Sequence, residues 1–146
     1  MDLILWRHAD AEDGYPDAQR KLSGKGHKQA AKMAAWLGTR VSKHVTVLVS
    51  PAVRTQQTAQ AFCSKFSTSE DVGLSANPDS ILRAAGWLQS AHTVIVVGHQ
   101  PTLGMTAAKL LTGREAEWSV RRGAIVWIAH KNGRNVLRAV LPPELV

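Results

Sequence analysis

Three short apolar runs constrain the fold of this chain more than any other feature. They hold four or five residues each, contain no charged side chain and are far apart in the sequence: Leu3–Trp6, Val45–Val49 and Val94–Val97. Runs of this length and composition are typical of strands that are buried on both faces of a sheet. Helical patterns separate them, and strands that alternate with helices form a mainly parallel sheet through right-handed crossovers. The sequence therefore predicts an α/β fold.

Four helices are predicted from capping residues and prolines at their starts. These residues are Ser23, Pro51, Asn77 and Pro101. The first helix is expected to reach about Val41, and Gly113 should stop the fourth. The second and third helices should each bury one apolar face, formed by Ala52, Ala59, Phe62 and Phe66 and by Leu82, Ala85 and Leu88, respectively.

The C-terminal part of the chain has a different pattern. Two further strands, 124–130 and 135–141, flank an Asn132-Gly133 turn, which is a strong signal for an antiparallel hairpin. The polar stretches 9–21 and 67–77 are predicted to be loops. With 146 residues, 45% of them hydrophobic, the chain suits one domain. We therefore expect residues 1–146 to form a single three-layer α/β domain, with a mainly parallel sheet flanked by helices and a C-terminal antiparallel hairpin.

Basic side chains follow each of the three apolar runs. Arg7 and His8 come directly after the first run, Arg54 lies shortly after the second, and His99 follows the third. Because the carboxyl ends of neighbouring parallel strands border one crevice, these side chains are expected to converge. Arginine binds phosphate oxygens with two donors at once, a neutral histidine can attack phosphorus, and a second, protonated histidine can add positive charge. The pattern favours a phosphoryl site.

The composition of the chain limits the classes of molecule that are expected to bind it. The formal net charge of +7 and the sequence pI of about 10.1 favour acidic partners. Scattered basic residues and only 5% aromatic residues argue against a nucleic-acid stacking platform. The single cysteine, Cys63, excludes an internal disulfide framework and is interpreted as a packing residue. No segment suggests a signal peptide or a membrane span, so we expect a cytoplasmic protein without a membrane or nucleic-acid partner.

The segment LILWRHADAE resembles the Arg-His-Gly signature of the histidine phosphatase superfamily, which includes the phosphoglycerate mutases. Later motifs of that family are matched in order by 22–26, 49–51 with Arg54, Thr55, Thr58 and Ala59, and 97–99. The short length is similar to that of the SixA-type phosphohistidine phosphatases. The resemblance implies His8 as the nucleophile, with Arg7, Arg54 and His99 as the catalytic phosphate pocket. It also implies that no metal and no other cofactor takes part.

The sequence departs from the family pattern at two places. Ala9 stands where the signature has glycine, which is a small change if the backbone there keeps a negative φ. Larger relatives carry an acidic proton donor and a lid in a helical insertion, whereas here that region holds only a short polar stretch with Glu70 and Asp71. No dedicated acid is identified. Asp10, Glu12 and Asp17, in the loop after His8, are the candidate proton donors.

The function predicted from these features is a metal-independent phosphatase. The resemblance to the SixA type implies that its substrate is a phosphohistidine on an acidic phosphotransfer protein, hydrolysed through a phosphohistidine intermediate on His8. Two alternatives stay open: a phosphatase for small phosphate esters, and a non-catalytic module that binds phosphate groups. Arg121 and Arg122 have two interpretations as well, as solvated strand-edge residues or as docking contacts for an acidic partner.

Overall fold

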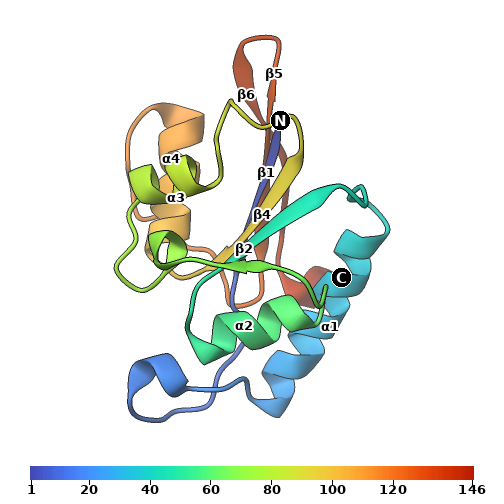
Figure 1. The fold of residues 1–146 in the computed structure, drawn as a ribbon, viewed down its shortest axis with the longest axis vertical. Helices are drawn as coiled ribbons and strands as arrows, with labels where there is room; N and C mark the ends of the chain where they lie inside the picture. The colour runs from blue at the N-terminus through green and yellow to red at the C-terminus, as the bar shows by residue number, and fades with distance from the viewer.

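A computed structural model describes all residues, 1–146, and contains one mixed six-stranded sheet (Figure 1). The spatial order of its strands is β3–β2–β4–β1–β5–β6. The strands are β1 (Asp2–Arg7), β2 (Val45–Val49), β3 (Ser67–Thr68), β4 (Thr93–Gly98), β5 (Ile125–Lys131) and β6 (Arg134–Leu141). The pairs β1·β4, β2·β4 and β2·β3 are parallel, whereas β5 is antiparallel to β1 and to β6. The predicted α/β class and C-terminal hairpin are confirmed.

Helices cover both faces of the sheet and complete the three layers. One face carries α1 and α2, and the other carries α3 and α4 (Figure 1). Their bounds are Gly24–Gly38, Val53–Gln60, Pro78–Ala84 and Thr102–Thr112. Three short 3₁₀ turns add η1 (Asp17–Gln19), η2 (Glu70–Val72) and η3 (Pro143–Leu145). None of the helices combines the length and the apolar character that a membrane crossing would need.

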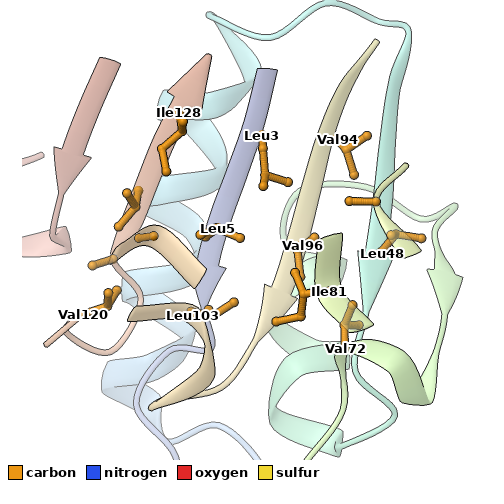
Figure 2. Packing of buried hydrophobic residues seen from close by; sticks show 14 residues of the cluster. Leu3, Leu5, Leu48, Val72, Ile81, Val94, Val96, Leu103, Val120 and Ile128 are labelled. Atoms are coloured by element: carbon orange, nitrogen blue, oxygen red, sulfur yellow. The ribbon is translucent and has the colours of Figure 1, made fainter. Parts of the chain in front are cut away.

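The central strand shows why its sequence is apolar throughout. Leu3 and Leu5 point into the cluster beneath α3 and α4, whose buried residues are drawn in Figure 2. Their neighbours Ile4 and Trp6 point into the opposite cluster, beneath α1 and α2. Successive side chains of a strand alternate between the two faces, so a strand covered on both faces must be apolar at every position. Because β1 is covered on both faces, its apolar run continues to Trp6, and the polar residues begin directly after it.

The second predicted helix was too long. Pro51 is not its first residue, because Ala52 is the N-cap of α2, and the helix runs from Val53 to Gln60. Phe62 and Phe66 therefore lie beyond it, although both still pack against the cluster beneath α1 and α2. The helix ends early because the chain must turn after α2 to bring β3 into parallel pairing with β2.

Smaller differences concern element ends. Helix α1 stops at Gly38 rather than near Val41. The 67–77 stretch is not a plain loop but contains β3 and η2, and the 9–21 stretch contains η1. Leu88 does not point inward: it lies past the end of α3, has a positive φ and is 55% exposed. The caps predicted at Ser23, Asn77 and Gly113 are confirmed: Ser23 caps α1, Asn77 forms a capping box, and Gly113 is left-handed after α4.

Candidate active site

The basic residues that follow the strands converge at one edge of the sheet. Arg7 ends β1, and the backbone N–H of His8 donates to the Gly98 carbonyl at the end of β4, at 3.1 Å. His99 follows Gly98, and Arg54 lies in the first turn of α2. Together they line a pocket of about 290 Å³, whose walls are Arg7, His8, Asp17, Arg20, Arg54, Leu74, His99, Gln100 and Arg122. The predicted convergence of the four residues is found in the structure.

His8 is held with one ring nitrogen free. Its Nδ1 lies 2.8 Å from the Ala9 carbonyl oxygen, and because a carbonyl only accepts, Nδ1 carries the proton. Nε2 then holds a lone pair. Burial, aided by the nearby His99 and Arg54, lowers the pKa of His8 to about 3, although the hydrogen bond to Ala9 acts in the opposite direction. His8 is therefore neutral at pH 7, which is the state that a nucleophile needs.

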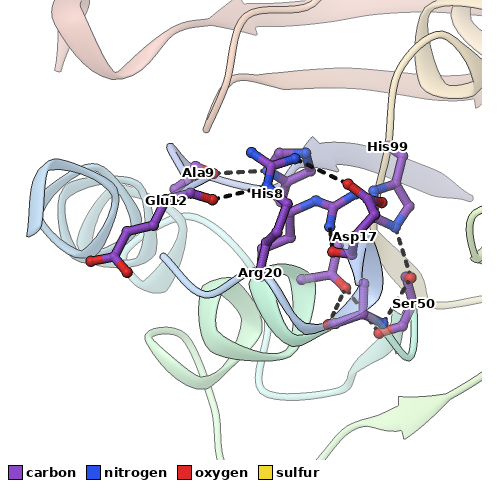
Figure 3. A network of polar contacts seen from close by, with 10 residues as sticks. His8, Ala9, Glu12, Asp17, Arg20, Ser50 and His99 are labelled. Atoms are coloured by element: carbon purple, nitrogen blue, oxygen red, sulfur yellow. Dashed lines mark hydrogen bonds and ion pairs between the residues drawn. The ribbon is translucent and has the colours of Figure 1, made fainter. Parts of the chain in front are cut away.

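His99 lies beside His8, with the two ring centroids 5.4 Å apart. Its Nε2 is 2.8 Å from the Ser50 hydroxyl at the end of β2 (Figure 3). Burial, and then the charge of Arg54, lower the pKa of His99 to about 4. His99 is therefore neutral at pH 7, in contrast to the expected protonated second histidine. The sequence reasoning also gave no role to Ser50, although its place directly after a buried strand was a usable signal.

Arg54 is oriented by Asp17, a residue from a distant loop. One terminal nitrogen, Nη1, donates to the Asp17 backbone carbonyl at 2.8 Å, and Nη2 donates to the carboxylate at 3.0 Å. The second carboxylate oxygen accepts from Arg20 at 3.1 Å (Figure 3). The side chain of Arg54 is only 5% exposed, whereas that of Asp17 is 55% exposed. Asp17 thus fixes the guanidinium from the solvent side of the pocket.

Three buried side-chain atoms in the protein have no hydrogen-bond partner, and all belong to this pocket. They are Arg7 Nε, Arg54 Nε and His99 Nδ1. A terminal nitrogen of Arg7 donates to the Val120 carbonyl at 2.8 Å, so only its Nε–H is left without a partner. The Ser50 hydroxyl can donate to His99 Nε2, in which case the proton of His99 lies on Nδ1 and makes Nδ1–H a donor. Buried polar atoms are rarely left without a partner. Three unsatisfied N–H donors in one pocket suit an anion with several oxygens.

Backbone geometry holds the loop that carries His8. Ala9 is fully buried, and its N–H donates to the Thr58 hydroxyl of α2 at 3.1 Å. Leu88 and Asn132 are the only non-glycine residues with positive φ, so alanine replaces the family glycine without backbone strain. The start of α1 packs tightly against the same loop, because a Cβ on Gly26 would overlap the Asp10 carbonyl. That contact requires glycine.

The candidate proton donors are not equivalent in position. Asp10 faces a neighbouring pocket, where its carboxylate accepts from Ser23 at 2.6 Å and pairs with Arg122 at 3.0 Å. The Ser23 bond, and then Arg122, lower its pKa. Glu12 is exposed and does not line the His8 pocket. Of the three, only Asp17 lies in that pocket, and bonds from Arg54 and then Arg20 lower its pKa.

Arg121 and Arg122 are exposed, but they lie in the turn before β5 and not on a strand edge. Arg122 lines the pocket of His8 as well as the neighbouring one. The sequence did not indicate that Arg122 lies at the His8 pocket, because the two loops that meet there are far apart in the sequence. No group of three or more His, Cys, Asp or Glu side chains is arranged so that it could hold a metal ion.

The depressed pKa values of His8 and His99 predict a pH-dependent stability. Both folded-state values, about 3 and about 4, lie below the ordinary value of 6.5. Below pH 6.5 the unfolded chain therefore binds protons that the folded chain does not, and stability falls as the pH decreases. The expected loss at pH 5 is about 2 kcal/mol for each histidine.

Urea unfolding at pH 7.5 and pH 5 measures this loss. The single variants His8→Asn and His99→Asn should each show a smaller difference between the two pH values than the natural protein does. The exposed His44 supplies the control, since His44→Asn should leave the difference unchanged. An equal loss in all four proteins would assign the pH dependence to other groups.

Comparison with known proteins places the chain among phosphatases. Residues 3–76 match the model of the histidine phosphatase superfamily, branch 1. The chain is 30% identical over 122 residues to phosphohistidine phosphatase SixA of Escherichia coli strain K12. The aligned region covers 77% of this chain and 76% of that protein.

Solved structures agree with this match. The protein histidine phosphatase SixA complexed with tungstate aligns with a TM-score of 0.84 and 25% identity, over 98% of this chain and 97% of that one. The α-ribazole phosphatase of Shigella flexneri aligns with a TM-score of 0.75 and 19% identity, over 98% of this chain and 97% of that one. The second likeness concerns the fold alone.

Proposed function

Because the chain belongs to the histidine phosphatase superfamily and is a phosphatase of that type, we propose that it hydrolyses phosphohistidine on an acidic phosphotransfer protein. In this proposal His8 is the nucleophile, and Arg7, Arg54 and His99 bind the phosphoryl group. Two relatives support the substrate class: one is named phosphohistidine phosphatase SixA, and the other holds tungstate, an oxyanion of similar shape and charge to phosphate.

The first step transfers the phosphoryl group to His8. The lone pair on Nε2 attacks phosphorus while the P–N bond of the substrate breaks, and its electron pair returns to the substrate imidazole. The bond formed and the bond broken are of the same kind, so neither product is strongly favoured. Negative charge on the three equatorial oxygens is stabilised by Arg7 and Arg54, whose free Nε–H donors face no protein acceptor.

The second step regenerates the enzyme. Water attacks phosphorus, the P–N bond to His8 breaks, and its electron pair returns to Nε2. The products are inorganic phosphate and neutral His8, and the proton of the attacking water passes to the phosphate or to solvent. The positive charge that both steps require comes from the arginines, so the proposed mechanism includes no metal.

One observation favours phosphohistidine over phosphate esters. The only carboxyl group that lines the His8 pocket is Asp17, and Arg54 and Arg20 hold it in the ionised form. An alkyl ester expels an alkoxide, which needs a proton from an acid in the transition state. Loss of a placed acid typically costs about 10²–10⁴ in rate. Imidazole is a much better leaving group, so phosphohistidine tolerates a pocket that lacks a protonated carboxyl.

The test is a comparison of kcat/KM between substrate classes. A histidine-phosphorylated phosphotransfer domain is compared with a panel of sugar phosphates, nucleotides and phosphoserine. We expect the phosphoprotein to be turned over at least about 100-fold more efficiently than any alkyl ester, since the esters lack their acid. Equal or faster turnover of one ester would instead establish a small-ester phosphatase. Selective loss of ester turnover in Asp10→Asn, Glu12→Gln or Asp17→Asn would identify an acid that this proposal excludes.

A further inference from the structure

A second polar pocket lies next to the proposed active site and shares two residues with it. Its volume is about 350 Å³, and it is formed where the loop after β1, the first turns of α1, the turn before β5 and the C-terminal segment meet. Arg7 and Arg122 line both pockets. The remaining lining residues are Asp10, Lys25, Gln29, Ser119, Val120, Arg121 and Glu144. A molecule bound at His8 can therefore extend into this pocket without leaving the protein surface.

The cations of this pocket are only partly neutralised. Arg122 pairs with Asp10 at 3.0 Å, but Arg121 reaches Glu144 only at 3.6 Å, and both of those side chains are mostly exposed. Lys25 makes no ion pair, and Arg7 donates to a neutral carbonyl. Four cations thus face two carboxylates. Exposed cations held close together without matching anions repel one another, and a bound anion relieves that repulsion.

The charge of a phosphoryl group does not account for this excess. That group is expected at His8, where Arg7, Arg20, Arg54 and Arg122 line the pocket with only Asp17 as a counter-charge. The cations on the far side of Arg7, namely Lys25 and Arg121, line only the second pocket. Ser119 and Gln29 add polar side chains to the same wall. The second pocket therefore has the lining of an anion subsite of its own.

We propose that the second pocket binds a carboxylate side chain that the substrate protein carries beside its phosphohistidine. This inference rests on the proposed function, because it takes a polypeptide as the substrate, and carboxylates are the anions that polypeptides supply. The pocket opens to solvent through exposed residues, so it suits a side chain presented by another protein. Lys25 and Arg121 are then specificity-determining residues, which select acidic surroundings of the phosphohistidine and leave the transfer step unchanged.

Two short phosphohistidine peptides test the inference, one with glutamates and one with glutamines on either side of the phosphohistidine. The double variant K25E/R121E reverses both charges of the subsite. Lys25 and Arg121 are exposed, and a glutamate in the first turn of α1 suits the helix dipole, so folding should be retained. The control K131E/R134E makes the same change in net charge at the tip of the β5–β6 hairpin, at the opposite end of the molecule (Figure 1).

The natural protein and the control should prefer the glutamate peptide about tenfold in kcat/KM at low salt, because complementary charges mainly speed encounter. K25E/R121E should lose that preference. All three proteins should hydrolyse p-nitrophenyl phosphate, a small ester with a good leaving group, within about twofold of one another, since it does not reach the subsite. Retained preference in K25E/R121E, or equal use of both peptides by the natural protein, overturns the subsite. Turnover of the ester but of neither peptide overturns the proposed function itself.

Discussion

Replacing His8 with alanine should lower kcat/KM at least about 10⁴-fold and abolish the covalent phosphoenzyme, because loss of a nucleophile removes the chemical path and not merely a contact. The expectation rests on the state of the ring. Nδ1–H is bound to the Ala9 carbonyl, and a pKa of about 3 leaves Nε2 unprotonated at neutral pH. The arginines are not nucleophiles at neutral pH, and both carboxylate oxygens of Asp17 already accept hydrogen bonds from Arg54 and Arg20, so we expect neither to replace His8.

Rapid quenching with a ³²P-labelled substrate measures the intermediate. The trapped label should be acid-labile and base-stable, as a P–N bond is. His44→Ala removes an exposed histidine far from the pocket and should retain both turnover and label. His8→Ala should still bind tungstate, which shows that the pocket is intact. Label on a serine, or label that persists in His8→Ala, would contradict the assignment.

The fold was predictable because its strands are buried on both faces. A strand such as β1, with Leu3 and Leu5 on one side and Ile4 and Trp6 on the other, leaves a continuous apolar signal in the sequence. The ends of these runs then locate the crevice, since parallel strands carry their functional residues at one edge. Arg7, His8, Arg54 and His99 could be assembled on that basis alone.

Features that depend on loops and on burial could not be predicted in this way. The contact of Asp17 with Arg54 depends on the path of the 9–21 segment, which has no periodic pattern that could fix it. The neutral state of His99 depends on burial and on the field of Arg54, neither of which is visible in the residue order. The ends of α1 and α2 were also misplaced, because tertiary packing decides where a helix stops.

The second large effect is expected at Arg54. Replacing it with alanine removes the side chain that Asp17 orients, and with it one of the three unpartnered buried donors of the pocket. Loss of a preorganised donor to transition-state charge typically costs about 10²–10³ in rate, and removal of the whole guanidinium should reach about 10³. Arg54→Lys keeps the charge but loses the planar fork, in which two terminal nitrogens bind Asp17 and Nε stays available, so it should recover no more than about tenfold.

Two measurements separate this role from a merely structural one. Tungstate binding should weaken in Arg54→Ala together with kcat/KM, whereas the phosphoenzyme should still form slowly on His8. Arg114→Ala, an exposed arginine just past the end of α4, should change neither quantity. If Arg54→Lys instead restored full turnover, a point charge would suffice, and the fork of donors that Asp17 holds in place would have no part in catalysis. Full tungstate affinity in Arg54→Ala would likewise exclude Arg54 from the phosphoryl pocket and leave Arg7 and His99 as its only ligands.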